Sequence, residues 1–401
     1  MAGVVIAIAL SPSDARAAAG QDWPPFVLVS GLLLVGMVSE QDGLFLAAGQ
    51  LLARRARNGV LLYCGAVALV AVVAALLNLD TAVAFLTPVF VYTARSRRES
   101  EAPLLFACIL LANAGSLILP GSNLTNLIVL GHAHMSGGEF FRRMAPAGLV
   151  SVLVTALVIG LWHRGELRAQ AAFEGGIERP RLGVGLAAVF AATALVVVLR
   201  NAAVPVLGVG VVAVLLRTRP WRAAVSGSLD VLGLPVLVGL FGIAVALGAL
   251  GRGWSGPSLL LARLGPWATA GVAAATTVLV NNLPAASLLS ARALSHPFSL
   301  LVGLNIGPNL FVTGSLAWVL WWRSARTVNA KPSLVGAVRL GLLSAPLAIA
   351  AAMLVLTASG TVHRTRERQA ALPSTRLGAT PEMSRRHLRA PSIKPMEDRL
   401  S

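Results

Sequence analysis

Asn78-Leu79-Asp80-Thr81 and Asn281-Asn282-Leu283-Pro284 each interrupt a long apolar run, and these two polar stretches decide the fold of the chain. Downstream of each lies a cluster of small and polar residues, Pro120-Gly121-Ser122-Asn123-Leu124-Thr125-Asn126 in the first half and Asn305-Ile306-Gly307-Pro308-Asn309 in the second. Polar backbone and amide groups are tolerated at membrane depth only where protein or a water-filled cavity satisfies them. The pattern, present once in each half, therefore predicts a binding site built from interrupted helices.

The composition excludes an ordinary soluble protein. The 401 residues are 56% hydrophobic and 12% charged, with a mean hydropathy of +0.77, whereas a soluble domain has about 25% charged residues. Such a length leaves room for roughly ten crossings of about 20 residues each. No Ser/His/Asp set and no pair of histidines with carboxylates falls together in the apolar segments, so we do not expect a membrane-embedded enzyme.

The charge and the cysteines exclude further classes. The net charge of +17 comes from arginines in short loops, as the preference for positive charge on the cytoplasmic side produces without a nucleic-acid partner. Cys64 and Cys108 lie singly in separate apolar segments. They form no disulfide framework and no zinc spacing, so we expect no metal and no cofactor, and we interpret both thiols as small apolar side chains rather than as ligands for a thiophilic substrate.

Arginine clusters flank the first polar stretch on both sides. One cluster precedes the apolar segment Leu61–Leu77, and the other follows Ala82–Ala94; they consist of Arg54, Arg55 and Arg57, and of Arg95, Arg97 and Arg98. If both are cytoplasmic, the unit is a re-entrant hairpin with Asn78–Thr81 at its tip. The alternative, a full crossing with a kink, would place one cluster outside, against the charge preference.

The second half repeats this order in the opposite orientation. A broken crossing, Leu104–Leu119 with Leu124–Leu130, follows the first hairpin, and an out-and-back pair follows at Val184–Leu199 and Val204–Leu216. A second hairpin, Ala268–Val280 with Ala285–Leu294, enters from the other face and precedes a second broken crossing, Phe298–Trp322.

The expected fold class is therefore an all-α polytopic membrane protein with inverted-topology repeats, each with a re-entrant helical hairpin and a broken transmembrane helix. We expect its first crossing at Pro24–Val38. The expected organisation is an N-terminal stump at 1–23, a first transport repeat at 24–163, a connecting loop and helix pair at 164–228, a second inverted repeat at 229–358, and a basic, disordered tail at 359–401.

At these polar stretches the chain resembles the ArsB-type arsenical efflux permeases. The first-half motifs are Asn78-Leu79-Asp80-Thr81 with Leu86-Thr87-Pro88, and Ala112-Asn113-Ala114-Gly115-Ser116-Leu117 running into Ser122-Asn123-Leu124-Thr125-Asn126-Leu127. The second-half motifs are Asn281-Asn282-Leu283-Pro284-Ala285, Gly307-Pro308-Asn309-Leu310 and Val312-Thr313-Gly314-Ser315-Leu316-Ala317. The resemblance covers roughly Pro24–Leu356, and the wider superfamily includes sodium/proton antiporters and sodium-coupled anion symporters.

The resemblance implies a multi-pass carrier of the cytoplasmic membrane that exports arsenite, with antimonite as a further substrate, in exchange for protons. The alternative is a sodium/proton antiporter or a sodium-coupled anion symporter of the same superfamily. The family usually has more apolar sequence before Pro24, so one or two N-terminal helices are expected to be missing here. The chain has no phosphate-binding Gly-rich loop, so any use of ATP would need a separate ATPase subunit as partner.

Arsenous acid is a small, neutral trihydroxy species near pH 7, and its site needs hydrogen-bond donors and acceptors rather than fixed charge. The candidate ligands are Asn78, Thr81, Ser122, Asn123, Thr125, Asn126, Asn281, Asn282, Asn305, Asn309, Thr313 and Ser315. Gly121, Gly307 and Gly314 would let the backbone approach the substrate. The alternative is that the amides only cap half-helices. Asn113 and Ser116 are expected to serve helix packing.

Asp80 is the deepest carboxylate of the hairpin system. An ionisable residue at membrane depth is a functional hypothesis by default, so Asp80 is the candidate for proton coupling. The alternative is a structural role in which its carboxylate caps the second half-helix of the hairpin.

Overall fold

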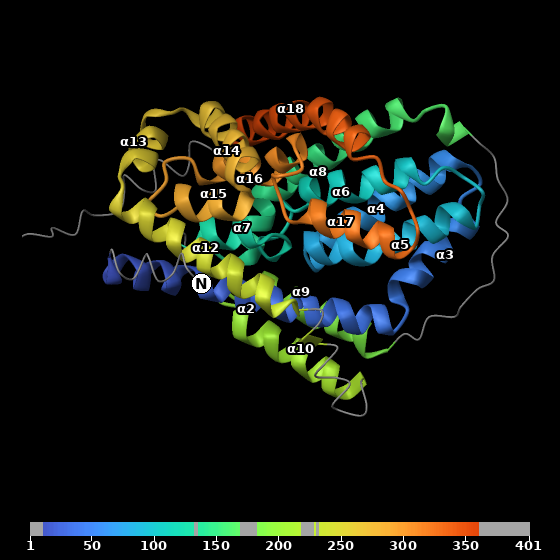
Figure 1. Cartoon of the computed structure of the whole chain (residues 1–401), viewed down its shortest axis with the longest axis horizontal. Helices are drawn as coiled ribbons and strands as arrows, with labels where there is room; N and C mark the ends of the chain where they lie inside the picture. The colour runs from blue at the N-terminus through green and yellow to red at the C-terminus, as the bar shows by residue number, and fades with distance from the viewer. Residues whose placement is uncertain (1–10, 132–134, 169–182, 218–227, 230–231, 361–401) are drawn as a thin grey trace, which may run out of the picture.

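The computed structural model describes residues 11–131, 135–168, 183–217, 228–229 and 232–360 (Figure 1). Every regular element among these residues is a helix, and none of them forms a strand. The expected disordered tail beyond Gly360, residues 1–10 of the expected stump and residues 169–182 of the connecting loop lie outside the described residues.

The described helices follow the expected order. Their bounds are α2 Pro12–Gln41, α3 Leu44–Arg55, α4 Gly59–Leu76, α5 Leu79–Arg95, α6 Ala102–Gly115, η1 Pro120–Ser122, α7 Leu124–Leu130, α8 Gly137–Trp162, η2 Glu166–Arg168, α9 Val184–Val198, α10 Ala203–Arg217, α12 Leu234–Gly253, α13 Gly256–Arg263, α14 Pro266–Val280, α15 Asn282–Leu289, α16 Pro297–Ile306, η3 Gly307–Leu310, α17 Ala317–Thr327 and α18 Leu334–Ala358. Among the described helices five, α2, α4, α8, α12 and α18, are long and apolar enough to cross a membrane. The expectation of an all-α polytopic membrane protein is confirmed.

The first hairpin is α4 with α5, and a buried arginine shows that both of its ends lie on one side. Arg97, just after α5, donates from Nη1 to the carbonyls of Ala53 at 2.7 Å and Ala56 at 2.9 Å, at the end of α3. Because α4 starts directly after α3, the beginning of α4 and the end of α5 lie together. The chain therefore enters and leaves this unit on the same side, and the full crossing with a kink is excluded.

The second hairpin, α14 with α15, opens toward the opposite end of the molecule. Arg292, just after α15, donates to the carbonyl of Arg252 at the end of α12, and α14 follows α12 through the short helix α13. In Figure 1, α14 and α15 lie at the left end and α4 and α5 at the right. The two hairpins therefore have the inverted orientation that the sequence predicts.

Helix α2 runs between the two hairpins and relates their positions. Its C-terminal end is fixed by Asp42, which accepts from the Gly185 N–H at 2.7 Å and pairs with Arg217 of α10. Its N-terminal part packs antiparallel on α12, where Phe26 meets Phe241 with ring centroids 5.3 Å apart. The end at Asp42 continues into α3 and the first hairpin. The other end lies beside the end of α12, where the second hairpin begins and ends.

The beginning of α2 corrects the sequence analysis. The helix starts at Pro12, not at Pro24, and runs through Pro24 and Pro25, so the expected boundary after residue 23 falls inside a helix. The sequence analysis assigned the residues before Pro24 to a stump, but Ala15 and Ala18 are buried because α2 packs on α12 there. Prolines are tolerated within membrane helices where neighbours satisfy the freed carbonyls.

The two halves interlace rather than lie side by side. The second part of the first broken helix, α7, packs on α15 of hairpin two, and the corresponding part of the second, α17, packs on α5 of hairpin one. Arg95, at the end of α5, donates to the carbonyl of Val328 at 2.7 Å, beyond the end of α17. Each hairpin therefore supports the broken helix of the other half, and the two breaks meet in the middle.

Candidate functional site

The first broken helix is held open by its own side chains. Between α6 and α7 the backbone unwinds, and Asn126 donates from Nδ2 to the freed carbonyls of Ser116 at 2.7 Å and Leu119 at 3.2 Å. Ser122 Oγ donates to the same Ser116 carbonyl at 2.6 Å. Asn123 caps α7 by accepting from the Thr125 N–H at 3.1 Å. These side chains replace the partners that a continuous helix would supply.

Asn305, near the end of α16, joins the two breaks. Its Oδ1 accepts from Ser116 Oγ at 2.6 Å and from Asn123 Nδ2 at 2.7 Å. Its Nδ2 donates to Asn126 Oδ1 and to the Leu301 carbonyl, both at 2.8 Å. A carboxamide has two N–H donors and two acceptor sites, so Asn305 is saturated. In this conformation it binds the other half of the protein, and a substrate could engage it only by displacing one of these partners.

Asn309 makes a second link between the halves. Its Oδ1 accepts from Asn113 Nδ2 at 2.9 Å, and its Nδ2 donates to the Leu110 carbonyl at 2.9 Å. The sequence analysis assigned Asn113 and Ser116 to helix packing alone, yet they are the first-half partners of Asn309 and Asn305. Their spacing of one helical turn on α6, next to a break, is the sequence signal that could have identified them.

The tip of the first hairpin is buried. Asn78 is 1% exposed and caps α5, because its Oδ1 accepts from the Thr81 N–H at 2.6 Å. Thr81 lies beneath Gly36 of α2, where a Cβ would stand 2.6 Å from its methyl group. Asp80, in the first turn of α5, is half-buried and makes no hydrogen bond or ion pair with another described side chain. Asn78, and not Asp80, therefore caps helix α5 at this tip.

The second tip is bound to the segment that follows η3. Asn281, with φ at +77°, donates from Nδ2 to the Thr313 carbonyl at 3.1 Å, and the Asn282 N–H donates to the Gly314 carbonyl at 2.8 Å. Thr313 Oγ1 in turn donates a hydrogen bond to the Val278 carbonyl at 2.5 Å. Leu279 beside it is 80% exposed. The two tips thus differ, since the first lies beneath α2 whereas the second has the exposed Leu279 next to it.

Several buried polar atoms around the tips and breaks have no hydrogen-bond partner among the described residues. They are Asn78 Nδ2, Thr81 Oγ1, Asn113 Oδ1, Thr125 Oγ1 and Ser315 Oγ. A buried polar group left unpaired costs about 1–3 kcal/mol, so each of these atoms calls for water or a ligand. The predicted ligands are therefore of two kinds. Some, such as Asn305, already make all their hydrogen bonds within the protein, and others hold a polar atom that could still bind a ligand.

Two of the three predicted glycines lie tightly against other segments of the protein. A Cβ at Gly307 would stand 2.6 Å from Ala274 Cα, and one at Gly314 would stand 2.5 Å from Pro308 Cα. At Gly121 it would meet Leu28 and Val196 at 3.4 Å, an ordinary contact. The close approach of backbone at Gly307 and Gly314 is therefore to other protein segments in this structure.

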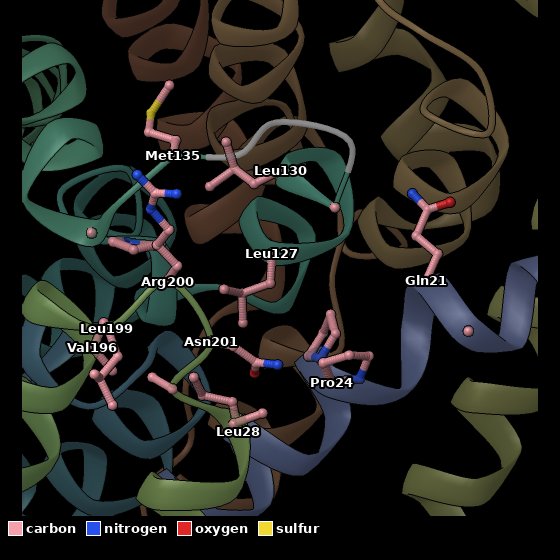
Figure 2. Close-up of a pocket in the computed structure, with 17 residues that line it drawn as sticks. Gln21, Pro24, Leu28, Leu127, Leu130, Met135, Val196, Leu199, Arg200 and Asn201 are labelled. Atoms are coloured by element: carbon pink, nitrogen blue, oxygen red, sulfur yellow. The ribbon is translucent and has the colours of Figure 1, made fainter.

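A cavity of about 370 Å³ lies beside the first break. It is bordered by the N-terminal part of α2, by η1 and α7, and by the turn between α9 and α10, and its lining includes Gln21, Pro24, Pro120, Leu127, Arg200 and Asn201 (Figure 2). Most of the lining is apolar, and the unpaired amides and hydroxyls are not part of it. The cavity therefore borders the first break but does not contain the unpaired groups of the proposed site.

Comparison with known proteins places the chain among transporters. It is 30% identical over 150 residues to the silicon efflux transporter LSI3 of Oryza sativa, covering 37% of this chain and 30% of that protein. It is 29% identical over 144 residues to the inner membrane protein YbiR of Escherichia coli (35% and 37%), and 20% identical over 147 residues to a Dictyostelium discoideum protein named "Putative transporter arsB" (37% and 26%). The chain thus spans about a third of the length of these relatives.

The fold and the family model agree with this placement. The crystal structure of the YdaH transporter of Alcanivorax borkumensis superposes with a TM-score of 0.54 at 16% identity, covering 86% of each chain, which shows a shared fold. The ArsB-type resemblance of the motifs is supported only at the level of the superfamily, because the matching family model is a different one. That model, described as "Citrate transporter", matches residues 1–320. The chain therefore belongs to the CitMHS citrate transporter family, a branch of the ion transporter superfamily of secondary transporters.

Proposed function

We propose that this protein exports arsenite, with antimonite as a further substrate, across the cytoplasmic membrane in exchange for protons. The observation that carries the proposal is the chemistry at the meeting point of the two breaks. The side chains that bind one another there are carboxamides and hydroxyls, and no charged side chain bonds to them among the described residues. A neutral trihydroxy solute can exchange hydrogen bonds with such groups without an ionic partner.

The unpaired groups identify the residues that would bind the solute first. Asn78, Thr81, Thr125 and Ser315 each hold a buried polar atom without a partner among the described residues. A hydroxylated substrate would satisfy these atoms, which gives it a favourable interaction that an apolar solute lacks. Asp80 stands in the same hairpin tip as Asn78 and Thr81. We propose it as a proton carrier, because it is the carboxylate nearest to these two residues in sequence.

Two relatives support the choice of substrate. One is named a silicon efflux transporter and another carries the arsB name. Each match covers only about a third of the relative, so these names support the proposal and do not establish it.

The description of the family favours a second candidate, a citrate transporter, which we propose as a sodium-coupled symporter by its resemblance to the wider superfamily. The structural observation behind it is that half-helices α5 and α15 begin at the two tips, and a helix N-terminus offers backbone N–H groups to an anion. A tricarboxylate would also need cationic partners, and among the described residues the tips contain only the acidic Asp80 as an ionisable group.

Transport into everted membrane vesicles distinguishes the two. We expect arsenite uptake that is driven by an imposed pH gradient, does not respond to sodium, and is not inhibited by citrate. Uptake of citrate driven by sodium, with no arsenite uptake, would reject the proposal in favour of the symporter.

Paired variants test whether the unpaired hydroxyls take part. Thr81→Val and Ser315→Ala should each lower arsenite uptake at normal expression. The matched control is Thr155→Val, which also removes a buried hydroxyl without a described partner, in helix α8, which carries none of the proposed ligands. Equal effects of all three substitutions would show that the hydroxyls at the site have no special role.

A further inference from the structure

Asp22 is a buried acid that neither the sequence motifs nor the tip geometry includes. It lies in α2 and is 1% exposed, and its Oδ2 has no hydrogen-bond partner among the described residues. An ionised carboxylate that is buried without hydrogen bonds is strongly unfavourable, and such a group becomes neutral or finds a partner. An acid retained at such a position inside a membrane helix indicates a function.

The nearest cation, Arg252 of α12, is not bound to it. Arg252 donates from Nη1 to the Gly248 carbonyl at 3.0 Å and from Nη2 to Gln21 Oε1, and no ion pair joins it to Asp22 among the described residues. Both side chains nevertheless border the space beside Gly248. A Cβ there would stand 3.3 Å from Arg252 Nη1 and 3.8 Å from Asp22 Oδ2. The guanidinium can therefore turn to Asp22 by a rotation of its own side chain.

Gln21 connects this cluster to the broken helix of the first half. While its Oε1 accepts from Arg252, its Nε2 donates to the Ile128 carbonyl in the last turn of α7 at 3.0 Å. The carbonyl of Arg252 accepts from Arg292, just after hairpin two. One line of hydrogen bonds thus runs from hairpin two through α12 and α2 to α7, the helix that carries Asn126.

The other ionisable groups near this line are few. Asp14 of α2 lies within electrostatic range of Arg252, and its carboxylate accepts from Ser11 Oγ at 2.7 Å. Arg200, in the turn between α9 and α10, lines the cavity on the side facing away from Gln21 (Figure 2). Helix α7 contains no ionisable residue, and α9 contains none. The only one in α10, Arg217, pairs with Asp42 at the far end of α2. Asp22 therefore faces Arg252 as its one nearby cation among the described residues.

We propose that Asp22 is a proton-binding site of the carrier and that its protonation decides which partner Arg252 binds. Neutral Asp22 leaves Arg252 on Gln21, which holds the end of α7 in place. Loss of the proton to the aqueous side leaves a carboxylate that draws Arg252 away, so that Gln21 loses a partner and α7 is released. The inference rests on the proposed proton exchange and adds to it a second proton site, at the outer end of the first broken helix.

Labelling of α7 tests this without any substrate. A single cysteine at Leu130, which ends α7 and lines the cavity, is introduced into Cys64→Ser/Cys108→Ser protein in detergent. Its rate of reaction with a maleimide is measured across pH and divided by the rate of a single cysteine that replaces the exposed Arg57, because ionisation of the thiol raises both rates with pH. We expect this relative rate to rise with pH when Asp22 is present. In Asp22→Asn, which imitates the neutral acid, the relative rate should stay low at every pH.

Two further variants, Asp14→Asn and Arg252→Gln, serve as controls for the effect of Asp22→Asn. Asp14→Asn removes an acid from the same helix and should keep the pH dependence. Arg252→Gln should abolish it, yet infrared spectra should still show the band of a protonated carboxylic acid, which Asp22→Asn loses. An unchanged pH profile of labelling in Asp22→Asn, or the absence of that infrared difference, overturns the proposal. Because no arsenite is present, failure of arsenite transport in vesicles would leave these results unaffected.

Discussion

Asn305→Ala is the substitution whose effect the structure defines most closely. The change removes bonds to Ser116, Asn123 and Asn126, all in the other half of the protein. The Leu301 carbonyl, its fourth partner, lies in the same helix. Bonds between membrane helices are worth about 0.6 kcal/mol each on average, which gives about 2 kcal/mol for the three.

A second contribution comes from the partner that is left alone. Ser116 Oγ keeps its bond to the Asn113 carbonyl, and Asn123 Nδ2 keeps a longer bond to Ser116 Oγ at 3.3 Å. Asn126 Oδ1 keeps no bond to a described residue, and an unsatisfied buried acceptor costs about 1–3 kcal/mol. We therefore expect Asn305→Ala to lower the free energy of unfolding by about 2–5 kcal/mol, and the lower values apply if water enters the vacated space and satisfies Asn126 Oδ1.

Unfolding by SDS in mixed micelles measures this loss. Trp318 is buried beside the second break, where its Nε1 donates to the Pro308 carbonyl at 2.9 Å, so the change in tryptophan fluorescence on unfolding includes a contribution from this break. Asn309→Ala removes fewer bonds and should cost about 1 kcal/mol. Ser344→Ala removes a buried hydroxyl that has no partner among the described residues and should change stability little. If Asn305→Ala is no more destabilised than Ser344→Ala, the network does not hold the two halves together.

The remaining predictions concern topology, thiols and coupling. In a cysteine-free background, single cysteines replacing Arg57 and Ser100, both exposed, should label from the cytoplasmic side only; labelling from opposite faces would reject the re-entrant hairpin. Cys64→Ser with Cys108→Ser should retain arsenite export, because the proposed site uses oxygen and amide groups, and lost transport in well-expressed protein would mean that a thiol binds substrate. Asp80→Asn should abolish arsenite accumulation driven by a pH gradient while it spares downhill flux; uphill transport with an unchanged pH profile would leave Asp80 a structural role.

The membrane fold could be predicted from the sequence because hydrophobicity and charge placement are local properties of the chain. A hairpin that begins and ends at arginine clusters cannot cross without placing one cluster on the wrong side, and the bond from Arg97 to the end of α3 has the geometry that this argument requires. The same arginine shows what the charge rule omits. Arg97 is buried and binds carbonyls, so it is a structural group as well as a topological signal.

Residue type alone could identify the candidate site but could not assign roles within it. Asn78, Asn123 and Asn305 look alike in sequence, yet Asn78 caps a half-helix, Asn123 both caps and crosses to the other half, and Asn305 is fully bonded. Which role an amide takes depends on the partners within about 3 Å. The partner that caps α5 or α7 is local, but the bonds between Asn305 and the first break join residues more than a hundred positions apart. The start of α2 was missed for the same reason, since its polar first turns become compatible with a helix only through packing on α12.

The sequence by itself determined that this protein is a membrane carrier with two inverted halves, because each half carries its own polar break in an apolar background. The tertiary structure decided how the halves interlace, which amides are occupied and which are free, and that Asp22 stands buried beside an arginine bound elsewhere. These features depend on side-chain contacts between helices distant in sequence, and the pattern of residues along a single helix carries no information about which helix will lie against it.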